Sequence, residues 1–140
     1  MTIKEIVKTL LSIGKAQSNV RYVNEGDIYT LNSLPNIEYG VFYITQNKHS
    51  ITADFNLINY NLNLFYVDRL TTDGNNKLDI QSAGMITLTN IINIFKNNFD
   101  VDVVGDVVFQ PFTQRFGDEC AGVYCTITIN ADNPIGDCEI

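Results

Sequence analysis

The sequence predicts an α+β fold: a single domain with an antiparallel sheet of about four to six strands and two main helices packed on one face. Apolar residues recur at helical spacing directly behind Thr2. Residues 59–66 alternate between polar and large side chains, so one sheet face is apolar and the other can face water. Helical periodicity returns from about Ile80 to Lys96. A doubly wound parallel sheet would instead be apolar on both faces.

The first helix is predicted from Thr2 to about Lys15. Thr2 and Glu5 have the spacing of a capping box, which stabilises a helix start. The apolar residues behind them predict one buried stripe: Ile3, Ile6, Val7, Leu10 and Leu11. Gly14 and the polar run 17–19 end the helix. Residues 20–35 are interpreted as a long structured connection around a possible short strand, Ile28–Leu31.

Two strands joined by a turn are predicted next. Residues 39–46 are rich in aromatic and β-branched side chains, residues 47–49 have turn character, and an apolar-rich run begins at Ile51. We therefore expect a hairpin here. The alternation that follows places four large side chains on one face (Tyr60, Leu62, Leu64, Tyr66) and four others on the opposite face (Asn59, Asn61, Asn63, Phe65).

The second helix is predicted to follow the turn at residues 73–76. Its core stripe consists of Ile80, Ala83, Leu88, Ile91, Ile92 and Phe95. Gly84 costs about 1 kcal/mol relative to Ala inside a helix, which leaves open a start nearer Met85. Two final strands are predicted, Val107–Phe112 and Val123–Ile129, with a loop at residues 113–122.

Composition excludes several classes of function. The net charge of −7 and the pI of about 4.4 disfavour binding in a DNA groove. Neither a signal peptide nor a membrane span is expected from the apolar patterning. The cysteines and the single histidine lack the paired spacing of a zinc site: Cys120, Cys125, Cys138 and His49. We expect reduced thiols, with Cys125 in the core and Cys120 in a loop.

No catalytic or cofactor-binding set is predicted. His49, which any nucleophilic triad would need, falls in an expected solvated turn. The aspartates between residues 100 and 106 lack the glycine and glutamate of a calcium loop, and no glycine-rich phosphate loop occurs. The prediction is a protein that is not an enzyme and takes no cofactor or metal. An enzyme using Asp79 or Asp118 as a general base is the least favoured interpretation.

The segment Phe112–Phe116 is the strongest candidate for a functional surface. It holds two phenylalanines and one arginine in a short predicted loop. Because aromatic and arginine side chains are enriched at interface centres, Phe112, Arg115 and Phe116 are the predicted subunit-interface residues. The alternative, that the two rings pack on the domain's own core, is equally open.

Two stretches of the chain carry a resemblance. The first is Leu64–Leu70 followed by Asp73–Ser82, and the second is Val108–Asp118 followed by Cys120–Tyr124. Their order within the predicted elements resembles the small tail-completion, tail-terminator and neck-ring proteins of tailed bacteriophages, most closely the ring proteins of crAss-like phages. The resemblance covers residues 40–130.

This resemblance implies that residues 1–140 form one tail-terminator-like, ring-subunit domain. Such a structural protein forms a homo-oligomeric ring around the DNA channel, at the head-tail connector (the portal–tail junction) or in the upper viral tail. The implied partners are further copies of the chain in a six-fold or twelve-fold ring, and neighbouring portal, ring or tail proteins. DNA passes through the lumen without sequence-specific binding, and no membrane is involved. The implied location is the virion tail or neck, with the host cytoplasm during assembly. The alternative is a monomeric acidic protein-binding module of the inhibitor or immunity type.

Overall fold

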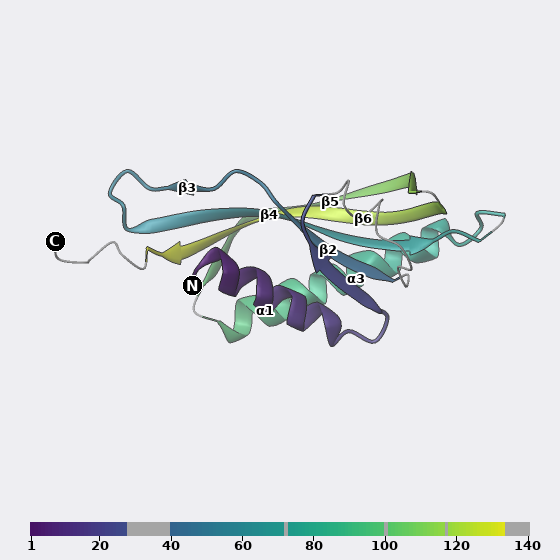
Figure 1. Ribbon diagram of the computed structural model, residues 1–140, viewed down its shortest axis with the longest axis horizontal. Helices are drawn as coiled ribbons and strands as arrows, with labels where there is room; N and C mark the ends of the chain where they lie inside the picture. Colours follow the sequence, from purple (N-terminus) through teal and green to yellow (C-terminus); the bar gives the residue numbers. More distant parts are fainter. Residues whose placement is uncertain (28–39, 72, 100, 117, 134–140) are drawn as a thin grey trace.

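Two helices lie on one face of a six-stranded, mostly antiparallel sheet in the residues that the structure describes (Figure 1). The computed structural model describes residues 1–27, 40–71, 73–99, 101–116 and 118–133, without the side chains of residues 114–116, 118 and 119. The helices are α1 (Ile3–Lys15) and α3 (Lys77–Asn98). The strands are β1 (Tyr22–Glu25), β2 (Val41–Gln46), β3 (Ser50–Ile51), β4 (Leu57–Arg69), β5 (Asp102–Phe116) and β6 (Asp118–Asp132). The predicted α+β class is confirmed.

The sheet is built around β4 and β6. β4 pairs antiparallel with β6 along its whole length, from Leu57 opposite Asp132 to Arg69 opposite Cys120. The strand order is β1-β2-β4-β6-β5, with β3 added beside the start of β4, and the β1–β2 pair is parallel. The strands β1 and β5 therefore form the two opposite edges of the sheet.

The two faces of β4 differ as the alternation predicts. Tyr60, Leu62, Leu64 and Tyr66 are buried in the main core beneath the helices. On the opposite face, which we call the open face, Asn59, Asn61, Asn63 and Phe65 are half-buried. A second, smaller cluster of buried residues on the open face contains Val41, Tyr43, Val67 and Cys120.

The start of α1 is the predicted capping box. The Thr2 hydroxyl accepts from the Glu5 backbone N–H, and the Glu5 carboxylate accepts from the Thr2 backbone N–H. Ile6, Val7 and Leu10 are buried as predicted. Ile3 and Leu11 are only half-buried, which corrects the predicted stripe, because these two side chains line a surface groove. That groove is described below.

The second helix begins at Lys77, earlier than the predicted Ile80 and well before the alternative start at Met85. Gly84 is buried inside α3, where the helix crosses the sheet. A Cβ on Gly84 would lie 2.6 Å from Val123 Cγ1 and 2.9 Å from Tyr66 Cδ2. The glycine thus allows a close approach of helix and sheet, and the packing gained there offsets its poor helix propensity.

The first half of the sheet differs from the prediction in two respects. The connection at residues 20–35 contains β1, which is too short to be recognised by periodicity, while Ile28–Leu31 lies outside the described residues. The expected hairpin between residues 39–46 and the run from Ile51 does not form. Instead, β2 pairs with β4, and the two-residue β3 pairs with the start of β4. The long β4 offers β2 more residues for backbone pairing than the two-residue β3 does.

The last two strands are longer than predicted and form one hairpin. Residues 113–116 and 118–122 belong to strands and not to the predicted loop: Phe112 pairs with Gly122, and pairing continues to Phe116 opposite Asp118. Small and polar residues suggested a loop, but strand pairing satisfies their backbone groups equally well. Between Val104 and Val108 the register shifts, and Gly105 adopts a left-handed φ of 74°. This irregularity is a β-bulge on the edge strand.

Candidate functional site

The predicted interface residues lie on β5. The Phe112 ring is half-buried and packs against rings on the open face, with centroids 6.3 Å from both Phe65 and Tyr124. Phe65 and Tyr124 stack at 5.2 Å. Phe112 therefore packs on its own sheet, as the alternative interpretation expects, while remaining partly accessible.

Arg115 and Phe116 lie at the closed end of the β5–β6 hairpin. The backbone register places Arg115 opposite Glu119 and Phe116 opposite Asp118. Their side chains lie outside the part of the chain that the structure describes. The described residues of the predicted loop therefore belong to β5 and β6, and the interface role of Arg115 and Phe116 stays a prediction.

A polar network covers the other half of the open face. Asn63 Oδ1 accepts from the Thr126 hydroxyl at 2.7 Å, and Asn63 Nδ2 donates to the Thr45 hydroxyl at 3.1 Å. Asn61 Oδ1 accepts from the Thr128 hydroxyl at 2.6 Å. These bonds link β2, β4 and β6 side by side. Asn61 and Asn63 thus stabilise strand pairing, because their half-buried side chains form hydrogen bonds with the neighbouring strands.

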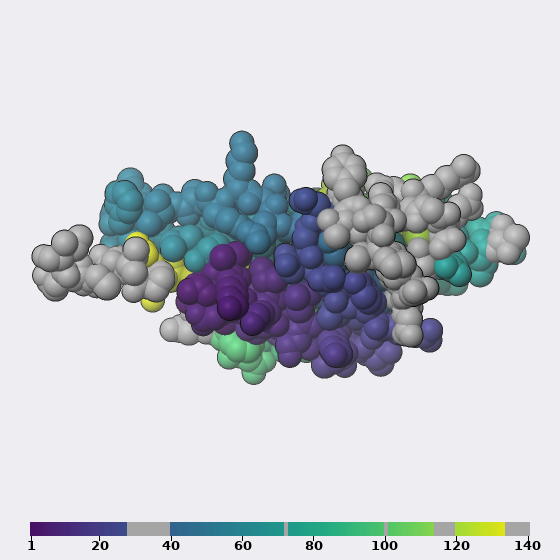
Figure 2. Space-filling view, in the orientation of Figure 1, coloured from purple at the N-terminus to yellow at the C-terminus, as the bar shows by residue number. Residues whose placement is uncertain are grey.

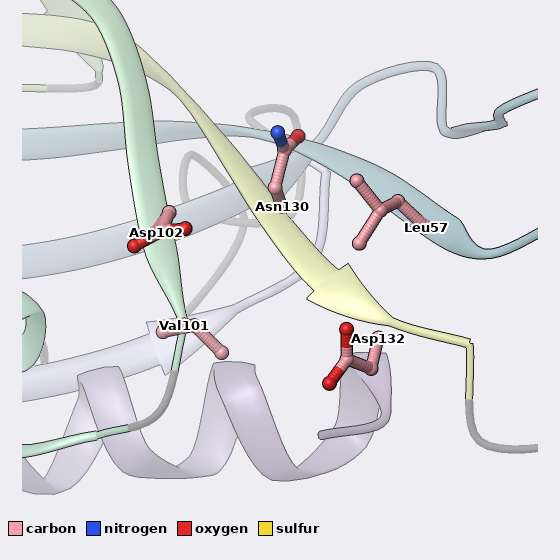
Figure 3. Close-up of a pocket in the computed structure, with 5 residues that line it drawn as sticks. All are labelled: Leu57, Val101, Asp102, Asn130 and Asp132. Carbon is pink, nitrogen blue, oxygen red and sulfur yellow. The ribbon is translucent and has the colours of Figure 1, made fainter.

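A small pocket of about 120 Å³ lies where β4, β5 and β6 meet (Figure 3). Leu57, Val101, Asp102, Asn130 and Asp132 line it. The Asn130 Oδ1 atom is buried without a hydrogen-bond partner, whereas Asp102 and Asp132 are exposed and lie apart on neighbouring strands. Among the described residues, no group of three or more His, Cys, Asp or Glu side chains could hold a metal ion. Asp102 and Asp132 therefore make the surface around this pocket acidic.

The solvent-facing side of α3, which we call the α3 outer face, carries large apolar side chains. Leu78 is 73% exposed, Met85 45%, Ile86 61% and Ile94 39%. The helix has no charged residue between Asp79 and Lys96. The stripe predicted for this helix contains none of these four residues, so the surface was not predicted. The available signal was a helix with apolar residues all round its circumference.

Hollows lie at both edges of the sheet. Between α1 and β1 is a groove of about 500 Å³, here called the α1 groove; Figure 2 shows α1 and the segment that leads to Asp27 side by side on this surface. Its lining residues are Ile3, Lys4, Val7, Lys8, Leu11, Asn24, Glu25 and Gln46. At the opposite edge, a hollow of about 240 Å³ between α3 and β5 is lined by Thr89, Ile92, Asn93, Lys96, Val107 and Phe109.

The residues considered for metal binding or catalysis are dispersed. His49 is exposed, and its Nδ1 atom accepts from the Asn61 backbone N–H at 3.2 Å. The imidazole thus binds the β4 backbone between the residues that pair with β2 and those that pair with β3. Cys120 is buried on β6 opposite Arg69, which corrects the predicted loop position. Cys138 and the side chain of Asp118 lie outside the described residues. Asp79 is exposed in the first turn of α3.

Cys125 is expected to resist alkylation in the folded protein. It is fully buried on β6, and burial raises the pKa of its thiol to about 12. Because the thiolate is the reactive species, almost no reactive form exists at pH 8. Iodoacetamide at pH 8 should label Cys125 only after denaturation, as measured by peptide mass spectrometry. Equal labelling of native and denatured protein would contradict the placement of Cys125 in the core.

No protein-family model matches the chain, and no curated protein matches it. In the described residues, neither helix is long and apolar enough to cross a lipid bilayer. The function is therefore argued from the surfaces described above.

Proposed function

We propose that this chain is a structural virion protein of a tailed bacteriophage, a subunit of a homo-oligomeric ring around the DNA channel at the portal–tail junction or upper tail. The observation that carries the proposal is the α3 outer face. Leu78, Met85 and Ile86 are exposed on a helix that is uncharged for four turns. Monomeric proteins rarely leave such apolar surface in water, so this face fits a contact with another subunit.

The resemblance supports the same proposal. Its two stretches fall on β4 with the start of α3, and on the β5–β6 hairpin. The strands β4, β6 and β5 are direct neighbours, so the resembling segments form one continuous part of the fold. The acidic composition also fits a channel protein, because a chain with a net charge of −7 repels DNA on average and lets it slide. Neighbouring portal, ring or tail proteins would bind the assembled ring.

The test is the oligomeric state of the purified full chain, measured by native mass spectrometry and negative-stain microscopy over a range of concentrations. Wild type should form closed rings. The double variant Met85→Glu with Ile86→Lys, which keeps the net charge, should assemble at least about tenfold more weakly, because charges in an interface core are costly. Its circular dichroism spectrum and free energy of unfolding should change little, since both positions are exposed.

The matched control is Ile51→Lys, which places a charge on an exposed apolar residue of β3. This variant should assemble like wild type. A wild-type chain that stays monomeric at every concentration would overturn the ring proposal. A monomer that forms a one-to-one complex with another protein would instead support the inhibitor or immunity type of module.

A further inference from the structure

We propose that copies of this chain join head to tail, with the β5 bulge of one copy docked in the α1 groove of the next. The β5 bulge is defined here as residues 102–108. The inference rests on the proposed function and deepens it, because it names the two surfaces that join neighbouring subunits. It uses features other than the α3 outer face, so the two can be tested separately.

The α1 groove combines an apolar lining with positive charge. Ile3, Val7 and Leu11 are apolar residues from successive turns of α1, and Lys4 and Lys8 are exposed beside them. The first 21 residues contain four basic residues: Lys4, Lys8, Lys15 and Arg21. Glu5 is the acidic residue of this segment, and its carboxylate is bound to Thr2 in the capping box. Glu25 is the acidic residue among those that line the groove.

The β5 bulge has the opposite character. Asp102 and Asp106 are exposed, and no basic residue occurs between Lys96 and Arg115. Val108 is 70% exposed, which is unusual for a β-branched side chain on a strand. Because β5 is an edge strand and the bulge disrupts its ladder, this segment is accessible from outside the sheet. It offers an exposed apolar side chain, Val108, near two exposed carboxylates.

These surfaces cannot meet within one copy. The strand order puts β1 at one edge and β5 at the other, with β2, β4 and β6 between them. α1 packs on β1 and β2, whereas α3 packs on β4, β5 and β6. Two complementary surfaces on opposite edges produce a heterologous contact, which closes into a ring or continues as a filament. The chain as a whole carries −7, so this contact between opposite charges also selects one docking orientation over others.

The experiment uses two charge-reversal variants of the full chain. The groove variant carries Lys4→Glu and Lys8→Glu, and the bulge variant carries Asp102→Lys and Asp106→Lys. Each variant alone has like charges on both surfaces and should assemble at least about tenfold more weakly than wild type. In an equimolar mixture, the reversed groove of one variant meets the reversed bulge of the other, so assembly should return. Only a head-to-tail contact between these two surfaces predicts this rescue.

Controls separate the outcomes. Lys48→Glu with Lys77→Glu changes the net charge as the groove variant does, at exposed sites outside both surfaces, and should neither disrupt assembly nor rescue the bulge variant. A second set of variants tests the same contact if a charge reversal impairs folding. One neutralises the groove with Lys4→Gln and Lys8→Gln, and the other neutralises the bulge with Asp102→Asn and Asp106→Asn. Each should weaken assembly and make assembly less dependent on salt concentration. If wild type assembles and the variants assemble equally well, this contact is wrong while the ring proposal stands. If each charge-reversal variant is monomeric and their equimolar mixture also stays monomeric, the contact is likewise wrong. A monomeric wild type overturns both proposals.

Discussion

Leu10→Asp is expected to produce unfolded or insoluble protein. Leu10 is completely buried between α1 and the sheet, in the same core as Phe42 and Leu62. The substitution removes a packed side chain and places a carboxylate among buried hydrophobic residues. The cost is about 4 kcal/mol or more, against a total stability of about 5 to 15 kcal/mol for a domain. Soluble yield and the circular dichroism spectrum measure the result.

The matched control for this variant is Ser12→Asp. Ser12 is exposed on the same helix, so the variant introduces the same charge without burying it. Its expected effect is within about 0.5 kcal/mol, since surface substitutions are usually small. A soluble Leu10→Asp protein that melts at the wild-type temperature would contradict the orientation of α1 on the sheet.

Gly84→Ala is expected to lower the free energy of unfolding by about 1 to 3 kcal/mol, the usual cost of overpacking a core. In an exposed helix the same change stabilises by about 1 kcal/mol, so the sign of the effect is diagnostic. The added methyl would collide with Val123 and Tyr66, which are both buried. Tyr66 cannot move easily, because its hydroxyl also accepts from Asn19 Nδ2. Urea unfolding followed by circular dichroism gives the difference.

Ser82→Ala is the control for Gly84→Ala. Ser82 is exposed on α3 two residues away, so its replacement improves helix propensity without any contact with the sheet. It should be neutral or slightly stabilising. If Gly84→Ala is also stabilising, α3 does not approach the sheet at this position.

Local sequence patterns were sufficient to predict the two helices and the apolar face of β4. The Thr2–Glu5 capping box and the buried residues Ile6, Val7 and Leu10 depend on contacts between neighbours along the chain, so helical spacing predicts them. The alternation in β4 is equally local. It identifies the apolar face without identifying which strands lie beside it.

The candidate surfaces could be predicted only in part. Phe112 was found from its aromatic character, but its packing against Phe65 and Tyr124 depends on strands that are distant in sequence. The α1 groove and the β5 bulge were not predicted. Each requires knowledge of which element stands at which edge of the sheet, and no short window of sequence carries that information.

The sequence by itself determined the α+β class, both helices and the inward face of the central strand, because short-range periodicity reports local conformation and burial. The tertiary structure alone decided the pairing of β2 with β4, the addition of β1, and the extension of the β5–β6 hairpin through residues 113–116 and 118–122. It also decided that Gly84 lies inside a helix. The physical reason is the same in each case. Strand pairing and close packing are interactions between segments that are distant in sequence, and their free energies exceed the weak local preferences for turns or helix ends.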